Sequence, residues 1–161
     1  MWRRLVFLIW LLPACVLAEV WTGHVTHVSD GDTLWIKPDD GSAARKVRLL
    51  GLDAPEICQP GGTAARMALQ QLVAEQPVQV RVNFQDTYGR DLGNLRVAGR
   101  DVGALLVAAG HAWSSRWHGR LGPYAIQEAA ARAAGLGLFA DPSALLPSDF
   151  RKHHGPCQTG P

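Results

Sequence analysis

Apolar and polar residues alternate along three stretches near the beginning of the chain. These stretches, 20–29, 33–37 and 45–52, are rich in β-branched and aromatic residues, and turn-forming residues at 30–31 and 38–42 separate them. Alternation with a period of two is typical of half-buried strands, and the Asp-Gly sequence at 30–31 favours a tight hairpin turn. We therefore expect three strands in an antiparallel meander.

Helical and strand patterns alternate through the middle of the chain. Apolar residues share one helical face over 63–75 and again over 102–109, and they alternate with polar residues over 78–84 and 92–97. The alanine-rich stretch 123–135 begins with proline and ends with glycine, as helices often do. Three strands, a helix, two strands and further helices predict a β-rich α+β fold, namely a five-stranded OB-fold barrel with three helices.

The beginning of the chain has the layout of a secretory signal peptide. Residues 1–18 hold two arginines, then an apolar run too short to span a bilayer, then small residues suited to cleavage after position 18. A second reading is a bacterial lipobox, in which Cys15 is lipidated and anchors the chain to a membrane. Strand sequence begins at Val20, which leaves almost no tether for an anchor and favours the cleaved form. We therefore expect a secreted or periplasmic protein that meets a membrane only if Cys15 is lipidated.

The end of the chain, 141–161, differs in composition from the predicted barrel domain, which we place at 19–140. This tail is rich in proline and small polar residues, as expected of a segment that is loose or ordered by a disulfide. Apart from Cys15 the cysteines are Cys58 and Cys157, an even number, and disulfides persist in exported proteins. We predict a disulfide between these two residues, and two unrelated free thiols are the alternative.

The net charge excludes recognition of a polyanion by a generally positive surface. The chain has 16 Lys and Arg residues against 14 Asp and Glu residues, and the two arginines of the expected leader account for the whole excess. The mature chain is therefore formally neutral when His is taken as uncharged. A nucleic acid would have to meet a local cluster of basic residues.

Charged residues gather around the end of the third predicted strand. Arg48 lies within an apolar run, and Asp53 and Glu56 follow it, although ionised groups beside a core run are costly unless they are paired or needed for chemistry. Another carboxylate, Asp32, lies at the first hairpin turn. The carboxylates of Asp32 and Asp53 and the carbonyl of Ala54 are oxygen donors of the kind that Ca²⁺ prefers.

Two arginines and a glutamate beside such an ion suit the hydrolysis of a phosphodiester. Arg48 offers a planar fork of donors to phosphate oxygens, and the predicted turn at 86–90 projects a second arginine, Arg90. Both would stabilise the negative charge that develops on phosphorus-bound oxygens. Glu56 would orient or deprotonate an attacking water. Taken alone, the turns at 30–31 and 86–90 are also explained as ordinary exposed turns.

Three motifs, DGDT, RLLGLDAPE and DTYGRDLG, resemble in order and spacing those of the staphylococcal nuclease (thermonuclease) family, over roughly residues 20–140. The resemblance implies an OB-fold barrel with three helices and Ca²⁺-dependent hydrolysis of DNA and RNA that leaves 3′-phosphate ends. It makes Asp32, Asp53 and the Ala54 carbonyl the calcium ligands, and it places Asp30 in the outer shell around the ion.

The same resemblance assigns the catalytic residues. It makes Arg48 and Arg90 the phosphate-binding arginines and Glu56 the general base. The sequence departs from the best-known member, which has a threonine where Ala54 stands and a longer loop where this chain has ICQPGG. That member also has a lysine where Thr87 stands.

Aromatic residues near the predicted site are candidates for contact with a base. The best-known family member has two tyrosines where this chain has Arg116 and His118. Aromatic rings stack on the bases of single strands, so we assign substrate contacts to Tyr88 and Trp117. For Trp113, packing in the core is the simpler interpretation.

Two classes of function follow from these residues. The first is an exported Ca²⁺-dependent nuclease of low sequence specificity, a monomer without a protein partner, that acts on DNA and RNA and prefers single strands. The alternative is a non-catalytic OB-fold envelope module that binds nucleic acid or protein. The chain keeps the whole set of charged residues that the chemistry needs, which favours the enzyme. That set is Asp32, Arg48, Asp53, Glu56 and Arg90.

Overall fold

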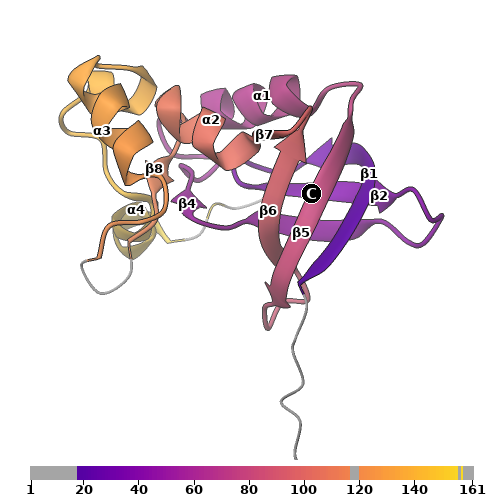
Figure 1. The fold of residues 1–161 in the computed structure, drawn as a ribbon. Helices are drawn as coiled ribbons and strands as arrows, with labels where there is room; N and C mark the ends of the chain where they lie inside the picture. The colour runs from indigo at the N-terminus through magenta and orange to yellow at the C-terminus, as the bar shows by residue number, and fades with distance from the viewer. Residues whose placement is uncertain (1–17, 117–119, 156, 158–161) are drawn as a thin grey trace, which may run out of the picture.

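Five strands close into a barrel in the computed structural model, which describes residues 18–116, 120–155 and 157 (Figure 1). The barrel strands are β1 (Glu19–Val28), β2 (Thr33–Pro38), β3 (Arg45–Leu49), β5 (Pro77–Gln85) and β6 (Asp91–Val97). Neighbours pair antiparallel in the order β3-β2-β1-β5-β6, and a parallel pairing of β3 with β6 closes the ring. This mixed barrel confirms the predicted OB-fold.

The helices cover one end of the barrel and extend away from it. They are α1 (Gly62–Val73), α2 (Val102–Ala108), α3 (Ala125–Ala133) and α4 (Pro147–His154), with a 3₁₀ turn, η1 (Gly137–Ala140). Figure 1 shows α1 and α2 over the barrel end, and α3 and α4 beyond them. The described residues therefore hold four α-helices, and the prediction of three was wrong. The fourth, α4, lies in the segment that composition marked as a tail.

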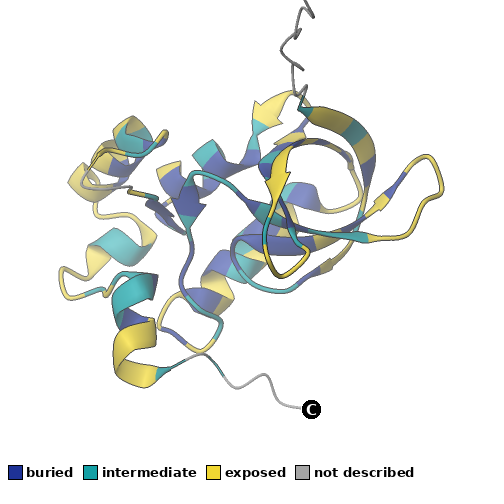
Figure 2. Ribbon diagram, turned by 90° about the horizontal axis from the view of Figure 1, so that it is seen from below, coloured by how far each residue is buried: buried dark blue, intermediate teal, exposed yellow. Residues whose placement is uncertain are grey.

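The hydrophobic core fills the space between the barrel and the first two helices. Its most completely buried side chains are Leu34, Ile36, Val47, Leu69, Val78, Val80, Leu95, Val102, Leu106 and Val107. These residues alternate along the strands and lie on one face of each helix, as the pattern predicts. Figure 2 shows the buried positions following the inner side of the barrel and the helices that pack on it.

The predicted strand 45–52 is interrupted in the structure. β3 ends at Leu49, Gly51 adopts a positive φ of 83°, and the chain re-enters a strand as β4 (Leu52–Asp53). β4 pairs with the short strand β8 (Trp113–Ser114) in a second sheet, while β7 (Arg100–Asp101) pairs antiparallel with the end of β6. Glycine tolerates this left-handed backbone where other residues are strained. The break carries Asp53 away from the barrel wall.

The C-terminal segment is fixed to the loop that follows Glu56. A disulfide joins Cys58 and Cys157, which are 99 residues apart, so this predicted bridge is confirmed. The expected leader, with Cys15, lies almost wholly outside the described residues. Within the described residues, none of the helices is long and apolar enough to cross a membrane.

Candidate active site

Three separate elements bring Arg48, Asp32 and Asp53 together. Arg48 lies on β3, Asp53 on β4, and Asp32 in the turn between β1 and β2. The Arg48 Nη2 atom lies 2.8 Å from Asp32 Oδ2 and 3.1 Å from Asp53 Oδ1. One nitrogen of the guanidinium thus bridges two carboxylates at the point where the interrupted strand leaves the barrel.

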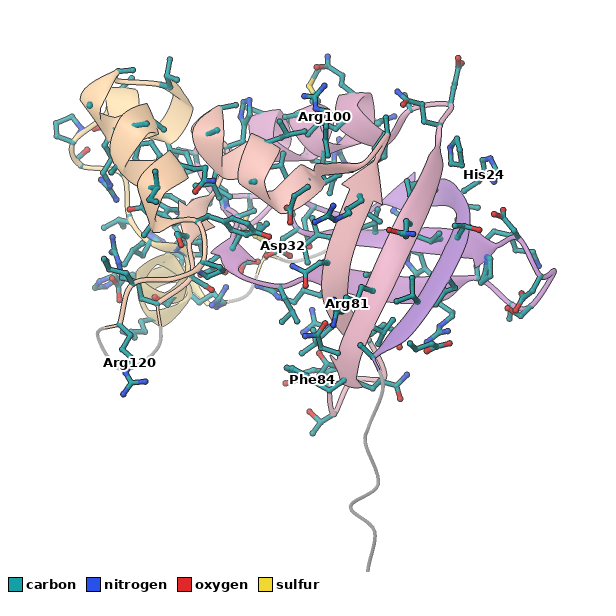
Figure 3. All side chains as sticks on the ribbon, viewed as in Figure 1. His24, Asp32, Arg81, Phe84, Arg100 and Arg120 are labelled. Atoms are coloured by element: carbon teal, nitrogen blue, oxygen red, sulfur yellow. A yellow bond between two sulfur atoms is a disulfide. The ribbon has the colours of Figure 1, made fainter. Side chains whose placement is uncertain are left out.

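The turn between β1 and β2 holds the Asp32 carboxylate inside the molecule. The N–H of Asp32 donates to Asp30 Oδ1 at 3.0 Å, and Asp32 Oδ1 accepts from the Thr33 hydroxyl at 2.8 Å. A Cβ atom on Gly31 would lie 2.6 Å from the Ala65 Cβ, so only glycine lets this turn pack against α1. Asp32 is consequently only 3% exposed, and Figure 3 shows it in the interior of the molecule.

The electrostatics of this cluster are dominated by burial. Burial raises the pKa of Asp32 to about 7; the positive charge of Arg48 opposes this shift, and the charges of Asp30 and Asp53 add to it. Burial also raises the pKa of Asp53, against the charges of Arg48 and Arg151. Burial by itself would lower the pKa of Arg48, but the carboxylates around it outweigh that effect and raise it. The carboxylates of Asp30, Asp32 and Asp53 thus all act on the one guanidinium of Arg48.

The donors of this cluster fit a hard divalent cation. Among the described residues there is no group of three or more His, Cys, Asp or Glu side chains arranged to hold a metal ion. Ca²⁺, however, also takes backbone carbonyls and water among its oxygen ligands. Asp32 and Asp53 converge on one point, the guanidinium of Arg48. The N–H of Ala54 lies 3.4 Å from Asp32 Oδ2, so Ala54 adjoins the cluster. The negative charge of these carboxylates is what a divalent ion would compensate.

A second arginine is fixed by the turn between β5 and β6. Asp86 Oδ1 accepts from the backbone N–H groups of Tyr88 and Arg90 at 2.9 and 3.0 Å, and Asp86 Oδ2 accepts from Arg90 Nε at 2.8 Å. These bonds explain why the pKa of Asp86 is lowered even though burial alone would raise it. The turn therefore holds the Arg90 side chain in one place.

Arg48, Asp53 and Arg90 line a single cavity of about 420 Å³. This volume lies within the range typical of sites for small ligands, about 300 to 1,000 Å³. The wall also includes Trp113 from β8 and Ser148 from α4. The structure thus brings both predicted phosphate-binding arginines to one concave surface, next to one of the two predicted carboxylate ligands.

The aromatic residues assigned to the substrate have different positions. Tyr88 is 84% exposed at the tip of its turn, outside the cavity lining, and the Arg90 guanidinium lies 5.5 Å from its ring centroid. Trp113 is buried and packs edge-to-face on Phe139, as core packing predicts. Trp117 lies outside the described residues.

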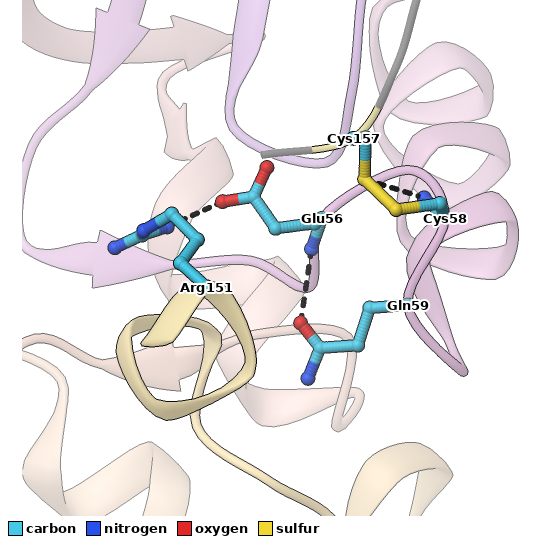
Figure 4. Close-up of a disulfide and its surroundings, with 5 residues drawn as sticks. All are labelled: Glu56, Cys58, Gln59, Arg151 and Cys157. Carbon is cyan, nitrogen blue, oxygen red and sulfur yellow. Dashed lines mark hydrogen bonds and ion pairs between the residues drawn. A yellow bond between two sulfur atoms is a disulfide. The ribbon is translucent and has the colours of Figure 1, made fainter. Parts of the chain in front are cut away.

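Glu56 lies on the loop between β4 and α1, and the sequence did not predict all of its contacts. Its backbone N–H donates to Gln59 Oε1 at 3.1 Å, and its carboxylate forms an ion pair with Arg151 of α4 (Figure 4). Sequence reasoning missed Arg151 because the tail was not expected to form a helix. The predicted disulfide was the available signal, since it places the tail beside the loop of Glu56.

Comparison with known proteins decides the family. A family model described as Staphylococcal nuclease homologue matches residues 46–141. The chain belongs to this family. Protein ParB of Escherichia coli is 38% identical over 141 residues, which cover 81% of this chain and 78% of that protein. Micrococcal nuclease of Shigella flexneri is 36% identical over 143 residues, covering 81% and 80%.

A third relative extends the comparison to more of the chain. An uncharacterized endonuclease of Haemophilus influenzae is 32% identical over 142 residues, covering 88% of this chain and 79% of that protein. The resemblance predicted from the motifs is confirmed, and membership of the Staphylococcal nuclease homologue family makes this chain a nuclease, and therefore a hydrolase. Helix α4 begins at Pro147, beyond the end of the family match.

Proposed function

We propose that this nuclease hydrolyses phosphodiester bonds of DNA and RNA with low sequence specificity, depends on Ca²⁺ and leaves 3′-phosphate ends. The observation that carries the proposal is the bridging of Asp32 and Asp53 by Arg48, at a cavity that Arg90 also lines. An oxygen donor set beside two guanidinium groups suits a phosphate with a hard cation.

The arginines act on the charge of the phosphate in this proposal. A guanidinium has five N–H donors, so Arg48 can pair with two carboxylates through Nη2 and still donate to a phosphate oxygen. Arg90, held by Asp86 and also part of the cavity wall, donates to the phosphate as well. Both stabilise the charge that grows on the phosphorus-bound oxygens as water attacks. Bound Ca²⁺, held by Asp32, Asp53 and the Ala54 carbonyl, would supply further stabilisation of that charge as a Lewis acid.

Glu56 orients the attacking water and accepts its proton. The new bond joins the water oxygen to phosphorus, and the bond from phosphorus to the 5′ oxygen breaks. The 5′ oxygen takes a proton from solvent water and leaves as a hydroxyl group, and Glu56 later returns its proton to solvent, so the phosphate stays on the 3′ side. This proposal assigns Glu56 the role of general base.

The proposal also covers the form of the nucleic acid that is cleaved and the compartment in which the protein acts. The cavity of about 420 Å³ is of a size to hold a single unstacked nucleotide, which supports a preference for single-stranded or breathing nucleic acid. Export to an oxidising compartment is supported by the Cys58–Cys157 disulfide, because such bonds persist there. We propose a monomer, free of the membrane unless Cys15 is lipidated.

Removal of calcium tests the proposal. We expect purified protein to digest heat-denatured DNA and RNA in Ca²⁺, to stop in EDTA, and to recover when excess Ca²⁺ is restored. The 5′ ends of the products should accept phosphate from a polynucleotide kinase without prior dephosphorylation, since they carry hydroxyl groups. Equal digestion in EDTA, or 5′ ends that already carry phosphate, would refute the calcium dependence or the end chemistry respectively.

A further inference from the structure

The segment that contains α4 contacts the loop of Glu56 at three points. The Cys58–Cys157 disulfide ties its far end, the Gln59 side chain donates to the Leu145 carbonyl at 2.7 Å at its near end, and Arg151 pairs with Glu56 between them. Figure 4 shows the disulfide, the Gln59 side chain and the Glu56–Arg151 pair around one short stretch of loop. The loop that carries the proposed general base is therefore held from both sides by the C-terminal segment.

Helix α4 also forms part of the cavity wall. Leu146, which precedes the helix, and Ser148 in its first turn line the same cavity as Arg48 and Arg90. Phe150, in the middle of the helix, is buried. The next residue in the helix, Arg151, reaches the Glu56 carboxylate. Helix α4 lies outside residues 46–141, which the family model matches, so the match itself does not describe this contact.

We propose that Arg151 is a positioning residue for Glu56, an inference that rests on the proposed function. Arg151 Nη1 donates to the Oε1 atom of Glu56 and thereby fixes the direction of the carboxylate. In this role Oε2 is left to accept the proton of the attacking water. A base whose orientation is set by a third group is a recurring arrangement in hydrolases. Arg151 acts through Glu56 and does not touch the phosphate.

The partial exposure of the Arg151–Glu56 ion pair indicates that its main role is not to stabilise the fold. The Arg151 and Glu56 side chains are 41% and 26% exposed, and ion pairs at such positions add little to stability. The disulfide and the buried Phe150 hold α4 in place without the pair. Removal of the Arg151 side chain should consequently change catalysis and leave the fold intact.

The test is a double-mutant cycle on full-length, oxidised protein that cleaves denatured DNA in Ca²⁺. We expect Arg151→Ala to lower kcat by roughly 10- to 100-fold with KM unchanged, the size typical for loss of a group that orients a catalytic residue. Arg151→Lys should recover part of kcat, since an ammonium group restores one charged hydrogen bond. In the Glu56→Gln background, Arg151→Ala should cause no further loss.

A matched control lies one residue along the same helix. Lys152 is 73% exposed and pairs with Asp149, so Lys152→Ala removes a positive charge from α4 and should keep the wild-type kcat and KM. Thermal melts confirm that each variant is folded. A rise in kcat in Arg151→Ala would make the pair an inhibitory contact and overturn the proposal, as would an equal loss in both backgrounds or a loss confined to KM.

The same measurements separate this inference from the function on which it rests. If the wild-type protein cleaves and Glu56→Gln is impaired while Arg151→Ala cleaves like the wild type, only the positioning role is overturned. If the wild-type protein does not cleave, or Glu56→Gln cleaves normally, the proposed function fails and the positioning role fails with it.

Discussion

Replacing Arg48 by alanine should lower the rate of phosphodiester cleavage by about 10²- to 10³-fold, the loss typical for one preorganised donor to a developing negative charge. This substitution is expected to cause one of the two largest losses of rate, because Arg48 contacts Asp32 and Asp53 and lines the cavity. The measurement is kcat on denatured DNA at saturating Ca²⁺.

Stability must be followed in the same Arg48 variant. Without the guanidinium, the buried Asp32 and the nearby Asp53 lose their shared partner, so the free energy of unfolding should fall. Arg48→Lys keeps the charge but loses the planar fork and should remain strongly impaired. Arg100→Ala is the control, because Arg100 is exposed on β7 and lies away from Asp32 in Figure 3. A folded Arg48→Ala protein that cleaves like the wild type would show that the phosphate binds elsewhere.

Glu56→Gln should lower the rate by about 10²- to 10⁴-fold, the usual contribution of a positioned general base. Glutamine keeps the shape of the side chain and an oxygen that can accept from Arg151, but it cannot take a proton at neutral pH. Substrate affinity and the melting temperature should change little. This combination would separate loss of chemistry from loss of structure.

A second glutamate, far along the chain from the site residues, provides the control for this variant. Glu75 is exposed just beyond the end of α1, and Glu75→Gln should cleave at the wild-type rate. If Glu56→Gln also kept that rate, the proton acceptor would have to be another group, and the role of the loop held by the disulfide would need a different explanation.

The barrel was predictable because strands such as β5 alternate between core and solvent. Val78, Val80 and Val82 face the core, while the residues between them are exposed. That pattern is local and needs no knowledge of the partner strands. The parallel pairing of β3 with β6 that closes the barrel depends on contacts between distant residues, and the sequence implied it only through the resemblance to a known family.

The break in the third strand and the fourth helix were not predictable in the same way. Leu49, Leu50 and Leu52 form a continuous apolar run, and only the positive φ of Gly51 divides it. Helix α4 has one buried aromatic residue, Phe150, among charged ones, so it lacks the repeated apolar face that signals a helix. Its proline start and glycine end were the remaining signals.

The candidate site was predictable as a set of residues but not as a set of contacts. The motifs placed Asp32, Arg48 and Asp53 in one site, and the structure brings these three side chains together. Arg151 was missed because its ion pair with Glu56 spans 95 residues of sequence. Such a contact leaves no local pattern in the sequence.

The central claim is that Asp32 and Asp53 hold a calcium ion beside the two arginines that bind the phosphate. A crystal structure of the protein with calcium chloride and a nucleotide inhibitor tests it most directly. We predict a cation at about 2.3 to 2.6 Å from carboxylate oxygens of both aspartates, with a phosphate of the inhibitor against Arg48 and Arg90. A cation bound elsewhere, or a phosphate remote from both arginines, would contradict the account.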